Sequence, residues 1–98
     1  MYELNFHPEA DIDFTEAMIW YERQQEKLGI RFSQAINDTL QRIQNKPELF
    51  HIVKGNFREV SVPVFPYSIV YKFNKRKGII LIVAIYHAKR NPKKKFRL

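Results

Sequence analysis

The sequence predicts an α+β fold, in the order β-α-α-β-β-β, with a helical hairpin packed on one face of a mostly antiparallel, twisted sheet. Three observations support this prediction. The hydrophobic period is that of a strand at the N-terminus, becomes that of helices up to Pro47, and returns to that of strands from Phe57. With 45% hydrophobic residues the chain is globular rather than disordered. Its 98 residues suffice for one domain, residues 1–98, with a single core.

The first half of the chain predicts a strand followed by a helical hairpin. Tyr2–Phe6 alternates apolar and polar residues, as a half-buried strand does. Pro8 suits the first turn of a helix, and the acidic residues after it favour the helix dipole. Gly29 interrupts the helical period and is expected to separate this helix from a second one, which Pro47 closes. The apolar stripes are Ala10, Phe14, Ala17, Tyr21 and Leu28 on the first helix and Phe32, Ala35, Ile36, Thr39, Leu40 and Ile43 on the second.

The second half predicts three strands. Arg58–Val62 alternates apolar and polar residues, and a turn with two prolines follows it. Tyr67–Phe73 alternates again, with its aromatic residues on one face, which predicts that they enter the core. Asn74–Gly78 predicts a hairpin connection. Ile79–Tyr86 is apolar on both faces, as expected for a central strand.

Charge is distributed unevenly along the chain. The first fifty residues contain nine acids and five Lys or Arg residues, whereas the remainder contains one acid, Glu59, and twelve Lys or Arg residues. The net charges are therefore −4 and +11, and the basic C-terminal tail, residues 87–98, holds six of the cations. We expect a polyanionic partner, either nucleic acid or an acidic protein segment. The tail itself is either a phosphate-binding arm or a solvated terminus.

Several classes of site are not indicated. The chain has no cysteine, which excludes a disulfide framework and a thiolate metal site. The sequence shows no zinc motif and no glycine-rich phosphate loop, so we expect no metal and no cofactor. The longest apolar run, Ile79–Tyr86, is too short for a membrane helix, and no signal peptide is visible. We expect a cytoplasmic protein without a membrane partner.

Six segments carry a family resemblance: Phe6–Ile12, Trp20–Glu22, Leu28–Phe32, Pro47–Phe50, Phe65–Tyr71 and His87–Pro92. In this order the chain resembles the RelE/ParE superfamily, the toxins of bacterial type II toxin–antitoxin systems. The resemblance covers nearly the whole chain and implies a cognate, acidic, partly disordered antitoxin. One branch of the superfamily cleaves mRNA in the ribosomal A site. The ParE branch poisons DNA gyrase and has no known catalytic residues.

The positions of cations favour the ParE branch. Cleavage of RNA by its own 2′-hydroxyl needs a base, an acid and a cation near the developing phosphorane charge. The RNase branch places three cations in the groove of the sheet and an arginine just past the last strand. Here the three groove positions are Glu59, Ser61 and Ser68, and only Arg90 matches. The resemblance therefore implies a ParE-like growth inhibitor, with gyrase as the expected target and no catalytic cycle.

Two alternatives remain open. One is a ribosome-dependent mRNA endonuclease whose site is built from Glu59, His87 and Arg90, since histidine can act as base or acid near neutral pH. A histidine at the end of a strand can equally be a structural hydrogen-bonding residue. The other alternative is a nucleic-acid-binding module without toxicity.

The sequence also predicts which residues meet a partner. Trp20 is either an exposed anchor or packs against the second helix, because its neighbour Tyr21 occupies the apolar stripe. Arg58 either forms an ion pair that holds the strand end or lines the groove edge. The residues expected to bind the antitoxin or nucleic acid are Trp20, Arg58, Lys89, Arg90, Lys93, Lys94, Lys95 and Arg97.

Overall fold

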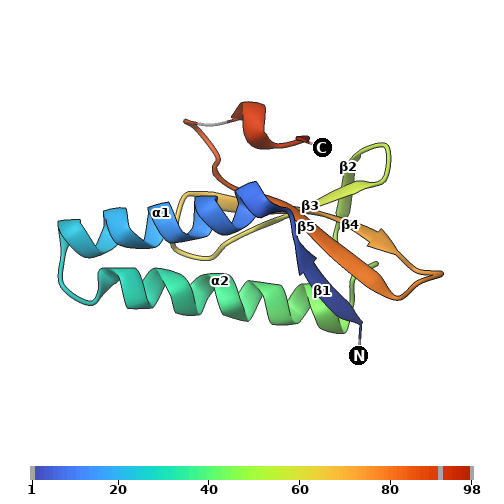
Figure 1. Cartoon of the computed structure of the whole chain (residues 1–98), viewed down its shortest axis with the longest axis horizontal. Coiled ribbons are helices and arrows are strands. Elements are labelled where there is room, and N and C mark those ends of the chain that lie inside the picture. The colour runs from blue at the N-terminus through green and yellow to red at the C-terminus, as the bar shows by residue number, and fades with distance from the viewer. Residues whose placement is uncertain (1, 91, 98) are drawn as a thin grey trace.

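A five-stranded mixed sheet carries two helices on one face, which confirms the predicted α+β arrangement (Figure 1). The computed structural model describes residues 2–90 and 92–97, so Asn91 and Leu98 of the predicted tail lie outside the described residues. The strands follow the order β1-β5-β4-β3-β2, with β1 parallel to β5 and all other neighbours antiparallel. The elements are β1 Glu3–Phe6, α1 Pro8–Gln24, α2 Leu28–Asn45, β2 His51–Lys54, β3 Phe57–Ser61, β4 Tyr67–Asn74, β5 Ile79–His87 and the 3-10 helix η1 Pro92–Lys94.

Strand β2 is not among the strands predicted from the sequence. It pairs antiparallel with β3, with His51 opposite Glu59 and Ile52 opposite Arg58. Three of its four residues are exposed, so β2 needs no alternation of apolar and polar side chains. The hydrophobic period, which located the other strands, carries no signal for such an edge strand.

The joint between the helices differs from the prediction. α1 ends at Gln24 and α2 begins at Leu28, so Gly29 lies in the first turn of α2 rather than in the break. Lys27, with φ of 69°, turns the chain instead. The Glu22 carboxylate accepts hydrogen bonds from the backbone N–H groups of Lys27 and Gly29, at 2.8 and 2.9 Å. It thereby satisfies free donors at the N-terminus of α2 and neutralises the positive end of its dipole.

The main core lies between the helices and the sheet. Phe32 is fully buried, with the rings of Tyr21, Phe65 and Tyr67 within 5.2 Å of it, centroid to centroid. Tyr71 is fully buried as well, and its hydroxyl donates to the Pro47 carbonyl at 2.6 Å. Burial raises the pKa of Tyr71 to about 12. The prediction that the alternate aromatic residues of this strand enter the core is confirmed.

A bulge in β5 creates a second apolar cluster on the opposite face of the sheet. Val70 pairs with Ala84 but Tyr71 pairs with Ile82, so Val83 is an extra residue on β5. Val83 and Ala84 consequently both join Val70 and Tyr86 in a buried cluster distinct from the main core. We call this side of the sheet, which the helices do not cover, the outer face.

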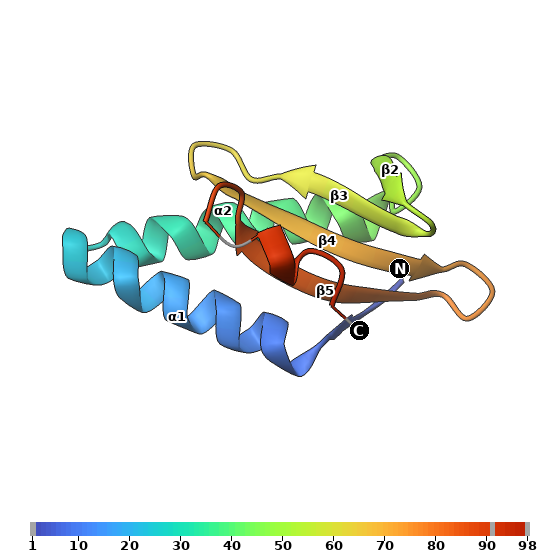
Figure 2. The same cartoon turned by 90° about the horizontal axis from the view of Figure 1, so that it is seen from above.

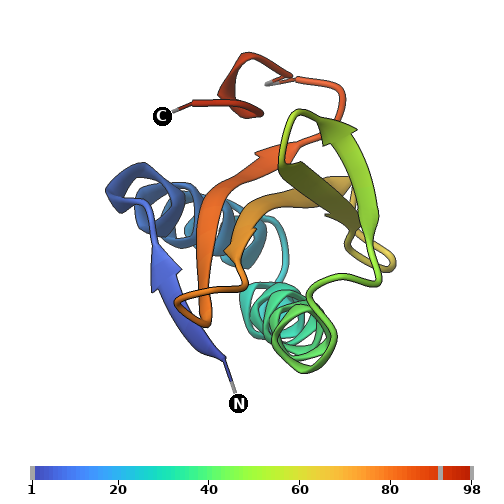
Figure 3. The same ribbon diagram turned by 90° about the vertical axis from the view of Figure 1, so that its right-hand side faces the viewer.

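The C-terminal tail covers the outer face. Residues 92–97 cross over β4 and β5, on the side of the sheet away from the helices (Figures 2 and 3). Phe96 packs against the outer cluster, and its ring lies 5.0 Å from that of Phe57. The interpretation of the tail as a solvated terminus is therefore wrong for Lys94–Arg97, which are all partly buried. No helix within residues 2–90 and 92–97 is long and apolar enough to span a membrane.

Candidate functional site

The outer face holds a small network of polar groups beside the apolar cluster. Alternation along β3 directs Val60 into the main core and Glu59 to the outer face. The Tyr86 hydroxyl donates to Glu59 Oε2 at 2.6 Å, and Lys95 of the tail pairs with Glu59 Oε1 at 2.8 Å. Ser68 lies beside the same carboxylate. Of the three residues that occupy the groove in place of the expected cations, Glu59 and Ser68 thus belong to one network.

These contacts fix the protonation states of the network. Burial acts to raise the pKa of Glu59, but the hydrogen bonds from Lys95 and Tyr86 outweigh it and hold that pKa below its ordinary value. Burial and the bond to Glu59 raise the pKa of Tyr86. At neutral pH Glu59 is an ionised carboxylate with a donor on each of its two oxygens, and Tyr86 is a neutral donor. The network has neither a free base nor a free cation.

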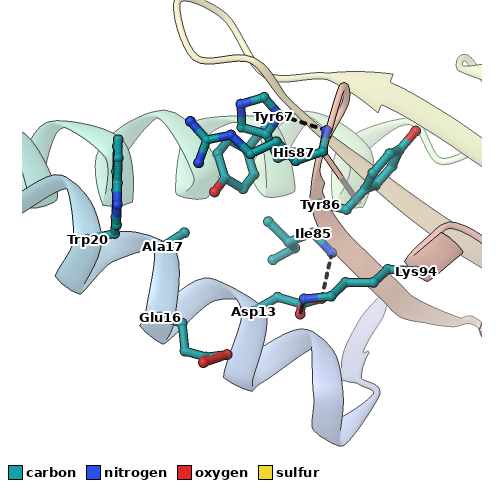
Figure 4. A pocket seen from close by; sticks show the side chains of 10 residues that line it. Asp13, Glu16, Ala17, Trp20, Tyr67, Ile85, Tyr86, His87 and Lys94 are labelled. Carbon is teal, nitrogen blue, oxygen red and sulfur yellow. Dashed lines mark hydrogen bonds and ion pairs between the residues drawn. The ribbon is translucent and has the colours of Figure 1, made fainter. Parts of the chain in front are cut away.

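A cavity of about 210 Å³ lies between α1 and the end of β5 (Figure 4). Asp13, 6% exposed, forms its charged wall. The Asp13 carboxylate pairs with Lys94 at 2.9 Å and with Arg97 at 2.8 Å, and it accepts the backbone N–H of Ile85 at 3.4 Å. That N–H lacks a strand partner because β1 pairs with β5 only as far as Ile82. Asp13 therefore binds the tail to α1 and to the edge of the sheet at once.

His87 closes the cavity at the end of β5. Its Nδ1 accepts the backbone N–H groups of Lys89 and Arg90, both at 3.2 Å, which fixes the turn that leads into the tail. Burial, and then the charge of Arg90, lowers the pKa of His87, so the ring is neutral at pH 7. Its ring packs edge-on against Tyr67, 5.4 Å between centroids. The structure thus gives His87 a hydrogen-bonding role in the turn.

The three residues of the endonuclease alternative do not come together. His87 and Arg90 both line the cavity. Glu59 lies on the outer face with Tyr86, and successive residues of a strand point to opposite faces, so His87 faces the helix side. Sheet backbone separates the carboxylate from the imidazole.

Trp20 is exposed, as one of its two interpretations predicted. Its side chain is 44% exposed, and it packs on its neighbour Tyr21 at 5.1 Å rather than being enclosed by α2. The guanidinium carbon of Arg90 lies over the indole ring, 5.4 Å from the centroid. An aromatic ring and a cation thereby stand side by side at the mouth of the cavity.

The remaining predicted partner residues are not gathered in one place. Arg58 points to the helix side and donates to the carbonyls of Glu48 and Phe50, at 3.1 and 2.8 Å, so it supports the loop between α2 and β2. Lys94, Lys95 and Arg97 are bound to Asp13 and Glu59 as described. Lys89, Arg90 and Lys93 are exposed. Sequence reasoning missed Asp13, although a carboxylate spaced between Ala10 and Ala17 on the apolar stripe was a signal for it.

Comparison with known proteins identifies the family of this chain. The family model described as "ParE toxin of type II toxin-antitoxin system, parDE" matches residues 4–92. The chain belongs to the ParE toxin family. A search of curated proteins found no match for this ParE-family toxin.

Solved structures share the fold of this ParE-family toxin at low sequence identity. A chain of the intact E. coli RelBE toxin–antitoxin complex is 16% identical, with a TM-score of 0.71 over 92% of this chain and 100% of that one. The isolated E. coli RelE toxin is 16% identical, with a TM-score of 0.69 over 92% and 87%. A chain of the chromosomal ParDE system from P. aeruginosa is 14% identical, with a TM-score of 0.64 over 91% and 98%. At these identities the likeness establishes the fold.

Proposed function

We propose that this ParE-family toxin inhibits growth by binding DNA gyrase, without a catalytic step of its own, and that a cognate acidic antitoxin silences it. The observation that carries the proposal is the network on the outer face. Cleavage of RNA needs free cations beside the scissile phosphate. Here Glu59 stands in the groove, and the lysine that reaches it, Lys95, is neutralised by it. The groove is also covered by Phe96.

A supercoiling assay tests the target. Purified toxin, added to gyrase with relaxed plasmid, should block supercoiling, whereas the same toxin added to an in-vitro translation reaction should leave transcripts uncut. Cut transcripts, lost on substitution of His87→Ala or Arg90→Ala, would establish the endonuclease alternative instead. Unimpaired growth of cells that express the toxin without its antitoxin would establish the non-toxic binding module.

The antitoxin proposal rests on the exposed surface around Trp20. Solved relatives include the RelBE complex and the ParDE system, in which toxin and antitoxin occur together. In this chain Trp20 and Arg90 offer an aromatic anchor and a cation, and Lys89 and Lys93 are exposed nearby in the chain. Aromatic and arginine side chains are the commonest hot spots of interfaces. We infer that the acidic antitoxin segment contacts this surface.

Truncation of the anchor tests this contact. Trp20→Ala should weaken antitoxin binding roughly thirtyfold, because hot-spot truncation costs about 2 kcal/mol. Ile30→Ala removes a side chain of similar exposure, 57%, from α2 and should leave the affinity unchanged. Titration calorimetry of both variants measures the difference. Equal affinities for the two variants would show that the antitoxin does not contact Trp20.

A further inference from the structure

A basic hollow lies at the hairpin between β4 and β5, apart from the cavity beside His87. It encloses about 610 Å³, and four cations line it: Lys72 of β4 and Lys75, Arg76 and Lys77 of the turn. The amides of Asn56 and Asn74 line it too, and no carboxylate does so among the described residues. Cations and amides are donors for phosphate oxygens.

The cations of this basic hollow differ from those of the tail in what surrounds them. Lys94, Lys95 and Arg97 are engaged by Asp13 and Glu59. In the hollow, Lys75 pairs with Glu48 at 3.3 Å, but both side chains are more than half exposed, so that pair is weak. Within the described residues, Lys72, Arg76 and Lys77 form no ion pair. Lys89, Arg90 and Lys93 of the tail are exposed as well, but the hollow gathers its four cations around one concave surface.

The turn fixes the backbone that carries three of these cations. The Asn74 side chain accepts the backbone N–H of Lys77 at 3.1 Å, and Gly78, with φ of 67°, supplies the left-handed position that the turn requires. Preorganised donors lose less entropy on binding than donors on a mobile arm. The hairpin tip is therefore built to present its charge.

The aromatic rings near the hollow are already in use. Lys72 lies over the Phe57 ring at 5.0 Å, and Phe96 packs on the same ring. Phe73 stacks edge-on with Tyr2, 4.9 Å between centroids. Single-stranded DNA or RNA binds through bases that stack on free aromatic rings. An acidic peptide gains affinity from side chains that anchor in apolar pockets. The hollow offers charge without such platforms, which suits the phosphates of a duplex.

We infer that the basic hollow binds the phosphate backbone of duplex DNA without sequence preference. The inference deepens the proposed function, on which it rests. Gyrase acts on DNA, so a toxin that contacts both gyrase and DNA would bind the enzyme while it has DNA bound. The toxin would then bind the gyrase–DNA complex more tightly than free gyrase, because it would contact the enzyme and the DNA at the same time.

Salt-dependent binding to a short labelled duplex tests the inference. The triple variant Lys72→Gln/Arg76→Gln/Lys77→Gln should bind more weakly than wild type. Its plot of log K against log salt should be shallower by roughly 2 to 3, since each phosphate contact contributes about 0.9 to that slope. The matched control is Arg23→Gln/Lys27→Gln/Arg31→Gln, which removes the same charge at the helix joint, far from the hairpin (Figure 1). The control should keep the wild-type slope.

Two results would overturn the inference: equal slopes for the two triple variants, or displacement of the duplex by polyglutamate as effectively as by unlabelled DNA. The second would assign the hollow to an acidic protein segment. A supercoiling assay on the same proteins keeps the two proposals apart. Equal slopes for the two triple variants, with gyrase still inhibited by the wild-type toxin, would refute the DNA site alone. A shallower slope for the hollow variant, without any inhibition of gyrase by the wild-type toxin, would refute the gyrase target alone.

Discussion

At the scale of single residues, the last two side chains of β5 point to opposite faces of the sheet and have different roles. Tyr86 points to the outer face and bonds Glu59, whereas His87 points to the helix side and caps the turn into the tail. Each side chain has a pKa displaced in the direction that keeps it neutral at pH 7. A neutral His87 can accept the two N–H groups at Nδ1, which an imidazolium could not do.

Acidification should therefore destabilise the toxin through His87. The ordinary pKa of histidine is 6.5, and burial lowers it in the folded state. As pH falls below 6.5, the unfolded chain takes up a proton that the folded chain does not, so the free energy of unfolding decreases. His87→Asn keeps an acceptor for the turn and removes the titration. Urea unfolding at about pH 7.5 and about pH 5.5 should show a smaller loss for the variant than for wild type.

Titration of Glu59 falls outside this pH window. The pKa of Glu59 is lowered from 4.5, so its stabilising contribution is complete above that value and is lost only as pH falls further, through the folded-state pKa. Equal losses for wild type and His87→Asn between the two pH values would contradict the structural role of the neutral ring.

At the scale of elements, Gly29 sets how closely the helices pack. A Cβ at this position would lie 2.7 Å from the Met18 carbonyl oxygen and 2.9 Å from Glu22 Oε1. The first atom belongs to the backbone of α1 and cannot move alone. The close approach also lets the Glu22 carboxylate reach the N–H of Gly29. Glycine is needed for proximity here, not for a left-handed conformation.

Gly29→Ala should therefore destabilise the hairpin. Overpacking costs about 1 to 3 kcal/mol, and the better helix propensity of alanine returns up to about 1 kcal/mol. We expect a net loss of about 1 to 2 kcal/mol in the free energy of unfolding. Gln34→Ala, at an exposed position of the same helix, should change it by less than about 0.5 kcal/mol. A stabilised Gly29→Ala variant in denaturant titrations would show that the helices can separate without cost.

At the scale of the whole molecule, the tail joins parts of the chain that are distant in sequence. Asp13 near the N-terminus holds Lys94 and Arg97 near the C-terminus, and Phe96 between them seals the outer cluster. The acidic first half and the basic second half of the sequence are thus partly neutralised against each other. What remains is a basic hairpin, with exposed Lys89, Arg90 and Lys93 at the start of the tail.

Removal of the Asp13 carboxylate should weaken the attachment of the tail to α1 and the sheet. Asp13→Ala leaves Arg97, whose side chain is 13% exposed, without its buried partner, and removes the acceptor of Ile85 N–H. We expect a loss of about 2 to 3 kcal/mol, below the full cost of an isolated buried charge because Lys94 can turn to water. Glu9→Ala removes a carboxylate that contacts the same arginine at 3.5 Å but is 63% exposed. That control should cost less than about 0.5 kcal/mol.

Thermal and urea unfolding of both variants measure the difference. Deletion of residues 92–98 should lower stability by at least as much as Asp13→Ala, because it also uncovers Val70, Val83 and Ala84. A deletion variant as stable as wild type would mean that the tail does not contribute to the fold.

The sequence by itself determined the elements that depend on local pattern. The helical stripes, the turn at Asn74–Gly78 and the buried β4 and β5 each follow from a hydrophobic period or a turn signal along a few residues. The absence of cations at Glu59, Ser61 and Ser68 was likewise legible in the chain, and it pointed to the ParE branch before the family match did. These hydrophobic periods are visible in the sequence because a helix or strand with one buried face needs apolar residues at regular spacing.

Only the tertiary structure decided how the charges are used. A run of basic residues looks the same whether it faces solvent or a carboxylate, so the sequence could not show that Asp13 and Glu59 bind the tail. Exposed β2 left no pattern, and the place of Gly29 depended on the approach of α1. Ion pairs join residues as far apart in the sequence as Glu9 and Arg97, and no local period encodes a separation of that kind.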